Sequence, residues 1–68
     1  MEELQYKHNL HRFYYWTRQA ENERSNARLQ CYQMAMGFGE KAKDHELKKG
    51  LKGTKLQMDL KKIVIKNL

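Results

Sequence analysis

The feature that most constrains this chain is a regular spacing of apolar residues between Tyr6 and Phe38. Steps of four and three residues alternate without a break, which is the spacing of the buried stripe of a helix that packs along another helix. Only Thr17 and Arg24 interrupt the apolar line. The spacing predicts an all-α protein with one long N-terminal helix, or two helices that meet in the polar run 21–26. The apolar members of this seam are Tyr6, Leu10, Phe13, Ala20, Ala27, Cys31, Met34 and Phe38.

The interruptions indicate how the seam is paired. In a parallel pair in register, Arg24 would face Arg24 inside the seam, and an unpaired buried charge is destabilising. An antiparallel pairing centred on Asn22 avoids this contact. Two copies can make such a pairing, and so can one chain that folds back as a hairpin, because both give the same contacts. We expect antiparallel packing in either case. The apolar pairs that this register predicts are Tyr6 with Phe38, Leu10 with Met34, and Phe13 with Cys31.

The length of the chain favours self-association. A core built from 68 residues is marginal without disulfides, a metal or oligomerisation. The single cysteine, Cys31, cannot form an internal disulfide. Apolar residues nevertheless make up 40% of the chain, which is not the composition of a disordered tail. We therefore expect a folded protein that is most simply a homodimer.

Glycines and a capping pattern predict how the rest of the chain is divided. Gly37 and Gly39 favour a helix end, because glycine readily adopts the left-handed conformation there. We expect residues 1–39 to form the seam and residues 40–68 to form a lysine-rich region of two short helices, 40–49 and 55–67. Thr54 and Gln57 have the spacing of a capping box at the start of the last helix. A final strand is the alternative there, since β-branched residues cluster within 62–66.

The distribution of charge suggests an anionic partner. Residues 1–39 carry a net charge of +1, whereas residues 40–68 contain nine lysines against four acidic residues, a net charge of +5. Such an asymmetry suggests a nucleic acid, an acidic protein or an anionic membrane surface as the partner, and of these we expect nucleic acid or a nucleoprotein. Lysines are point charges, so we expect phosphate contacts that tolerate any sequence. The predicted nucleic-acid-binding residues are Lys41, Lys43, Lys48, Lys49, Lys52, Lys55, Lys61, Lys62, Lys66, Arg12 and Arg18.

A group of aromatic residues supports a second hypothesis. Residues 13–16 are four consecutive aromatics, and they point around the whole helix, so one partner helix cannot bury them all. Exposed aromatic side chains often anchor protein–protein interfaces. The alternative function is therefore an inhibitor or adaptor that docks a helical face onto a larger enzyme or assembly. Its partner-binding residues would be Tyr14, Tyr15, Trp16 and Tyr32.

Catalytic chemistry has little support in the sequence. His8 and His11 lie three residues apart, but two ligands do not complete a zinc site. Cys31 lies on the seam, and no phosphate-binding glycine loop or paired-carboxylate pattern occurs. We expect no enzymatic activity, no metal, no cofactor and no small-molecule substrate. The apolar runs are too short to span a membrane, and an unpaired cysteine is typical of a reducing compartment, so we expect a cytoplasmic protein.

Overall fold

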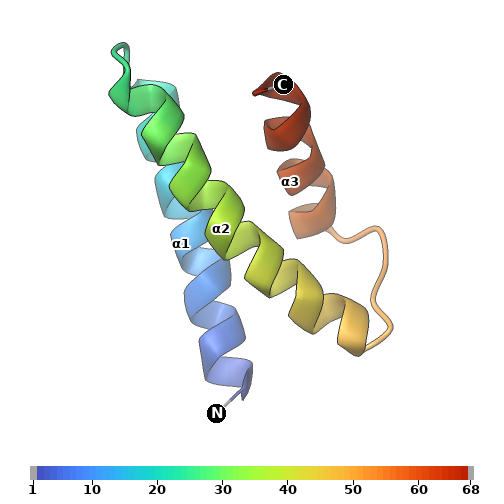
Figure 1. Cartoon of the computed structure of the whole chain (residues 1–68). Helices are drawn as coiled ribbons and strands as arrows, with labels where there is room; N and C mark the ends of the chain where they lie inside the picture. Colours follow the sequence, from blue (N-terminus) through green and yellow to red (C-terminus); the bar gives the residue numbers. More distant parts are fainter. Residues whose placement is uncertain (1, 68) are drawn as a thin grey trace.

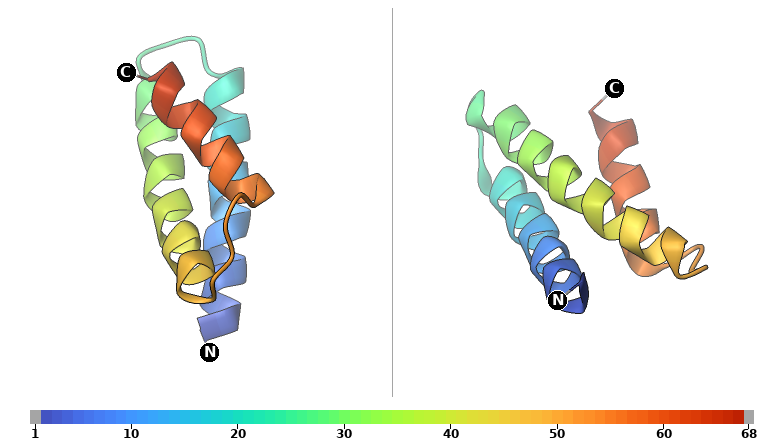
Figure 2. Two further views of the ribbon diagram at one scale, coloured as in Figure 1. Left: turned by 90° about the vertical axis from the view of Figure 1, so that its right-hand side faces the viewer. Right: turned by 60° about the horizontal axis from the view of Figure 1, so that its bottom comes forward.

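The computed structural model describes residues 2–67, and within them the chain forms three helices. These are α1 (Glu2–Asn22), α2 (Ala27–Lys48) and α3 (Lys55–Lys66). Helices α1 and α2 run antiparallel as a hairpin, and α3 returns across one face of α2 (Figures 1 and 2). The predictions of an all-α fold and of antiparallel packing are confirmed. The hairpin forms within one chain.

The hairpin turns in the polar run 21–26, so of the two alternatives the pair of helices is correct and the single long helix is not. The backbone N–H of Glu23 donates to the carbonyl of Ala20 at 3.2 Å, which closes the end of α1. At the start of α2, the hydroxyl of Ser25 accepts from the N–H of Ala27 at 3.3 Å, and its carbonyl accepts from Arg28 at 3.0 Å. Arg24 lies in this exposed connection. It therefore does not interrupt a packed stripe.

The prediction that a helix ends at Gly37–Gly39 is wrong, because α2 continues through both glycines to Lys48. Gly39 is buried where α1 and α3 both reach α2. The left-handed glycines are instead Gly50, with φ of 79°, and Gly53, with φ of 69°, and both lie in the connection to α3. The expected separate helix 40–49 is therefore the second half of α2. Gly39 serves close packing rather than helix termination.

The predicted pairing register is also wrong. The ring of Tyr6 stacks on His45 with centroids 4.7 Å apart, so Tyr6 lies about two helical turns along α2 from the expected Phe38. The inward side of α2 is shifted by one residue from the predicted seam, and Met34 is 46% exposed. Small residues dominate this inward side, which lets both other helices approach it. Its buried members are Tyr32, Ala35, Gly39, Ala42 and Glu46.

Helix α3 confirms the prediction of a helix rather than a strand, and its start has the expected cap. The hydroxyl of Thr54 accepts from the backbone N–H of Gln57 at 3.2 Å. The side chain of Gln57 reaches back to the N–H of Gly53 at 3.0 Å, one residue earlier than the usual box. The buried residues of α3 are Leu56, Leu60 and Ile63. Together with Phe13, Ala20 and the inward apolar residues of α2 they make one core.

Glu46 ties the three helices together. This carboxylate is only 3% exposed, and it accepts hydrogen bonds from the hydroxyl of Tyr6 at 2.5 Å, the hydroxyl of Thr54 at 2.5 Å and the side-chain amide of Gln57 at 3.0 Å. Burial raises the pKa of Glu46, but these three hydrogen bonds outweigh it and hold the pKa below its usual value. The carboxylate thereby joins the start of α3 to α2 and α1.

Candidate nucleic-acid interface

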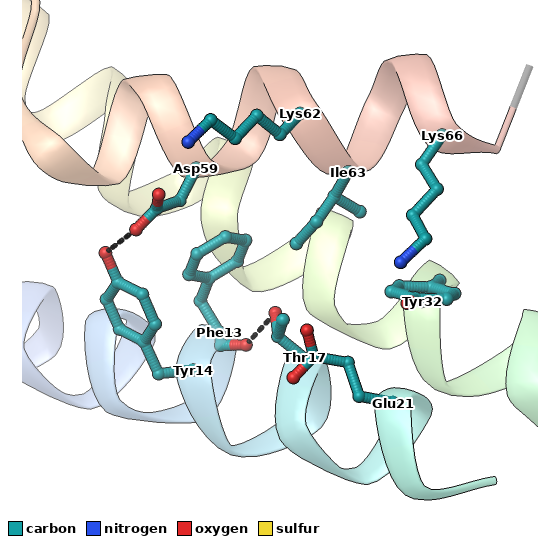
Figure 3. Close-up of a pocket in the computed structure, with 9 residues that line it drawn as sticks. All are labelled: Phe13, Tyr14, Thr17, Glu21, Tyr32, Asp59, Lys62, Ile63 and Lys66. Atoms are coloured by element: carbon teal, nitrogen blue, oxygen red, sulfur yellow. Dashed lines mark hydrogen bonds between the residues drawn. The ribbon is translucent and has the colours of Figure 1, made fainter.

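A groove separates α3 from α1, since α3 packs mainly on α2 (Figure 3). We call it the α1–α3 groove, and its volume is about 350 Å³. Helix α1 contributes Phe13, Tyr14, Thr17 and Glu21 to it, and α2 contributes Tyr32. The wall on the α3 side consists of Asp59, Lys62, Ile63 and Lys66. The groove thus has an aromatic and aliphatic lining with charged groups at its rim.

A polar cluster closes one end of the groove. The hydroxyl of Tyr14 donates to Asp59 at 2.8 Å, and the ammonium of Lys55 lies 2.9 Å from the same carboxylate oxygen. That ammonium also lies 4.9 Å from the centroid of the Tyr14 ring. The hydrogen bond from Lys55 is the main reason why the pKa of Asp59 is lowered, while burial is the main cause of the raised pKa of Tyr14. The negative charge of Asp59 is therefore already compensated.

Two cations lie on the ring of Tyr32, which is 3% exposed. The guanidinium of Arg28 is 5.8 Å from the ring centroid, and the ammonium of Lys66 is 5.7 Å from it. Figure 3 shows Lys66 reaching from α3 down onto this ring. The buried hydroxyl of Tyr32 has no hydrogen-bond partner among residues 2–67. We call Arg28, Tyr32 and Lys66 the Tyr32 cluster.

A second cluster, also made of an arginine and a lysine over an aromatic ring, lies outside the α1–α3 groove. Arg12 and Lys41 are 5.6 Å and 5.7 Å from the centroid of the Phe38 ring. Phe38 is partly buried, and it does not line the groove. We call Arg12, Phe38 and Lys41 the Phe38 cluster. Each cluster contains one arginine, one lysine and one aromatic ring, but only the Tyr32 cluster contributes residues to the lining of the α1–α3 groove.

The predicted lysines divide into paired and unpaired groups. Three are in ion pairs: Lys43 with Glu40 at 4.0 Å, Lys49 with Glu3 at 3.0 Å, and Lys55 with Asp59 at 2.9 Å. The other predicted cations form no ion pair within the described part of the chain, and all of them are exposed. Those cations are Lys41, Lys48, Lys52, Lys61, Lys62, Lys66, Arg12 and Arg18. Helix α3 carries Lys61, Lys62 and Lys66 within its last two turns.

The predicted aromatic anchors have unequal exposure. Tyr15 is 50% exposed and packs edge-on against the partly buried Trp16, with centroids 5.2 Å apart. Tyr14 faces the groove, and Tyr32 is buried beneath its two cations. The expectation of an exposed face therefore holds best for Tyr15 and fails for Tyr32.

Sequence reasoning missed three residues that shape the site, namely Gly39, Glu46 and Arg28. A signal for the first two was present, because Tyr32, Ala35, Gly39, Ala42 and Glu46 also follow steps of three and four. Small and charged residues give this stripe a weak apolar pattern, so the neighbouring stripe through Cys31 and Phe38 dominated the prediction. Arg28 had no sequence signal, since its role depends on the return of α3.

The fold and the groove define a small basic protein in which a third helix crosses a helical hairpin. Comparison with protein-family models, with curated proteins and with solved structures gave no match. Within residues 2–67, His8 and His11 belong to no group of three or more potential metal ligands. None of the helices in this described range is long and apolar enough to cross a bilayer.

Proposed function

We propose that this chain is a non-enzymatic nucleic-acid-binding protein, acting on free nucleic acid or on a nucleoprotein, that contacts phosphates through its lysines. The observation that carries the proposal is the end of α3, where Lys61, Lys62 and Lys66 are exposed and lack an ion-paired carboxylate within residues 2–67. Asp59 of α3 and Glu46 of α2 are already engaged by other donors, and Glu21 of α1, which lines the same groove, forms no ion pair with these lysines. The positive charge of α3 therefore remains available to a polyanion.

The geometry favours binding that tolerates many sequences. Lysine ammonium groups attract phosphates as point charges, whereas reading a base edge needs a fixed donor geometry. The helix with the unpaired lysines also exposes Met58 and Ile65, which carry no hydrogen-bonding group that could read bases. Affinity should therefore depend strongly on salt and weakly on sequence.

A matched pair of double variants tests this proposal by fluorescence anisotropy with labelled DNA duplexes. Lys61→Gln with Lys62→Gln removes two unpaired charges, whereas Lys43→Gln with Lys49→Gln removes two that already have carboxylate partners. Each engaged lysine contributes roughly −0.9 to the slope of log K against log salt on duplex DNA. The first variant should flatten the slope by about 1.8 and the second by much less. Absence of binding by the unaltered protein at low salt would reject the proposal.

The second candidate function is a protein-binding inhibitor or adaptor, and the exposed Tyr15 beside Trp16 favours it. Aromatic side chains of this kind anchor many interfaces. Pull-down from lysate with and without nuclease separates the two functions. A partner that is retained after nuclease treatment and is lost with Tyr15→Ala supports the adaptor. A partner that disappears with nuclease supports nucleic-acid binding.

Self-association remains part of the proposal, but it needs a different surface from the predicted seam. The chain pairs α1 with α2 internally, so a homodimer of folded hairpins would use outward apolar residues such as Leu29 and Met34. Light scattering coupled to gel filtration at micromolar concentration measures the mass directly. A monomer that becomes no larger on concentration would remove the homodimer from the proposal.

A further inference from the structure

We propose that the Tyr32 cluster and the α1–α3 groove together bind one unstacked nucleotide of a single strand. The phosphate would lie between Arg28 and Lys66, and the base would enter the groove. This inference rests on the proposed nucleic-acid function and adds to it a preference for single strands over duplex. It also assigns a role to Arg28 and Tyr32, which phosphate contacts by exposed lysines leave unexplained.

The phosphate part of the site is built by cations from two helices. Arg28 lies in the first turn of α2 and Lys66 in the last turn of α3, and both reach the same ring. Neither forms an ion pair within residues 2–67. Ser25 and Asn26 already accept hydrogen bonds from the first N–H groups of α2. The positive charge of the site therefore comes from the side chains of Arg28 and Lys66 and not from the end of the helix. A guanidinium fork beside an ammonium suits a phosphodiester oxygen pair.

The base part of the site is the groove beside this pair. Its volume of 350 Å³ is near the lower end of the range of about 300–1,000 Å³ that is typical of ligand pockets. Aromatic rings are platforms for unstacked bases, and arginine adds to such stacking. Lys66 now covers the ring of Tyr32. A bound phosphate would draw its ammonium aside and open the ring to a base.

The unpaired hydroxyl of Tyr32 is the observation that points to a ligand here. A buried hydroxyl without a partner is destabilising, and the Tyr32 side chain that carries it lines the α1–α3 groove. Base edges carry both hydrogen-bond donors and acceptors. A base can therefore supply the hydrogen-bond partner that the Tyr32 hydroxyl lacks, once Lys66 has moved. By contrast, the Phe38 cluster has the same two kinds of cation but no hydroxyl and no share in the groove.

The carboxylates at the rim predict which bases fit best. Asp59 is engaged by Tyr14 and Lys55, but Glu21 lines the groove without a hydrogen bond or ion pair in the described chain. A free carboxylate accepts from the exocyclic amino group of cytosine and repels the carbonyl oxygen that thymine presents at the same place. We therefore expect oligo-dC to bind more tightly than oligo-dT, and Glu21→Gln to remove that difference.

The two clusters provide a matched experiment. The test variant is Arg28→Gln with Lys66→Gln, and the control is Arg12→Gln with Lys41→Gln, since each removes an arginine and a lysine from one aromatic ring. Labelled oligo-dC and a duplex of equal length are titrated by fluorescence anisotropy at fixed salt. The test variant should lose about tenfold or more in affinity for the single strand beyond its loss for duplex, the scale of one stacked base. The control should weaken both ligands by the same factor.

If both double variants weaken both ligands equally, the nucleotide site is overturned while phosphate binding by lysines stands. If the unaltered protein binds neither ligand at low salt, the proposed function itself fails. Tyr32→Phe keeps the ring in the core and removes only the hydroxyl, so it should fold normally and still bind the single strand several-fold more weakly. An unchanged single-strand affinity in Tyr32→Phe would remove the hydroxyl from the site.

Discussion

Gly39 and Phe13 approach each other so closely that α2 has no room for a side chain at this point. A Cβ on Gly39 would lie 2.7 Å from Cδ1 of Phe13 and 2.9 Å from Cδ1 of Leu60. Phe13 belongs to α1 and Leu60 to α3, so a single glycine sets the distance of both helices from α2. Phe13 also lines the α1–α3 groove, so this contact positions one residue of the groove wall.

Gly39→Ala should destabilise the protein by about 1–3 kcal/mol, because its methyl group would overpack against two buried side chains. Gly37→Ala is the matched control, since a Cβ there meets nothing within 4 Å. That variant should be more stable by about 0.5–1 kcal/mol, as alanine favours a helix over glycine. Urea unfolding followed by circular dichroism measures both. Equal stabilisation of the two variants would contradict the packing role of Gly39.

Tyr6→Phe should cost roughly 1.5–3 kcal/mol of stability, because the hydroxyl of Tyr6 donates to the buried carboxylate of Glu46. Tyr15→Phe makes the same chemical change at a residue that is half exposed, and it should be neutral within about 0.5 kcal/mol. Thermal melting of the two variants compares them directly. A neutral Tyr6→Phe would mean that Thr54 and Gln57 satisfy Glu46 by themselves.

Acid should destabilise the fold through Glu46. Its pKa is lower in the folded protein than the usual 4.5, so the folded state binds its proton more weakly than the unfolded state does. Its contribution is fully present above pH 4.5 and is lost as the pH falls through the folded-state pKa. Urea unfolding at a series of pH values from neutral downward measures the loss. Glu46→Gln should show a flatter dependence below pH 4.5, and an unchanged profile would exclude Glu46 as its source.

Alkali should act through Tyr6, for which the sign is the opposite. The hydrogen bond to Glu46, followed by burial, raises the pKa of Tyr6 from 10.0 to about 12. The stability that comes from the neutral hydroxyl is complete below pH 10 and is lost as the pH rises to about 12. Ultraviolet absorbance of phenolate should therefore include a tyrosine that titrates near pH 12 and that is missing from Tyr6→Phe. Loss of an early-titrating tyrosine in that variant would contradict the Glu46 contact.

The sequence by itself determined those features that depend only on residues close to one another along the chain. The period of three and four residues predicted helices, the polar run 21–26 was the place of a possible break, and Thr54 with Gln57 predicted the start of α3. Composition indicated the positive charge of residues 40–68, including Lys62 and Lys66 of the groove. Each of these signals acts within one or two turns of the chain, so no knowledge of the packing was needed to read them.

Only the tertiary structure decided which stripe of α2 faces inward. Two adjacent stripes share the same period, and an isolated hairpin would favour the larger residues Cys31, Met34 and Phe38. Because α2 must accept α1 and α3 on neighbouring sides, the stripe with Ala35, Gly39 and Ala42 is buried instead. That choice turns Glu46 inward and places the ring of Tyr32 next to Arg28 in the first turn of α2 and Lys66 in the last turn of α3. Local periodicity cannot contain this information, because it arises from how closely three helices can approach one another.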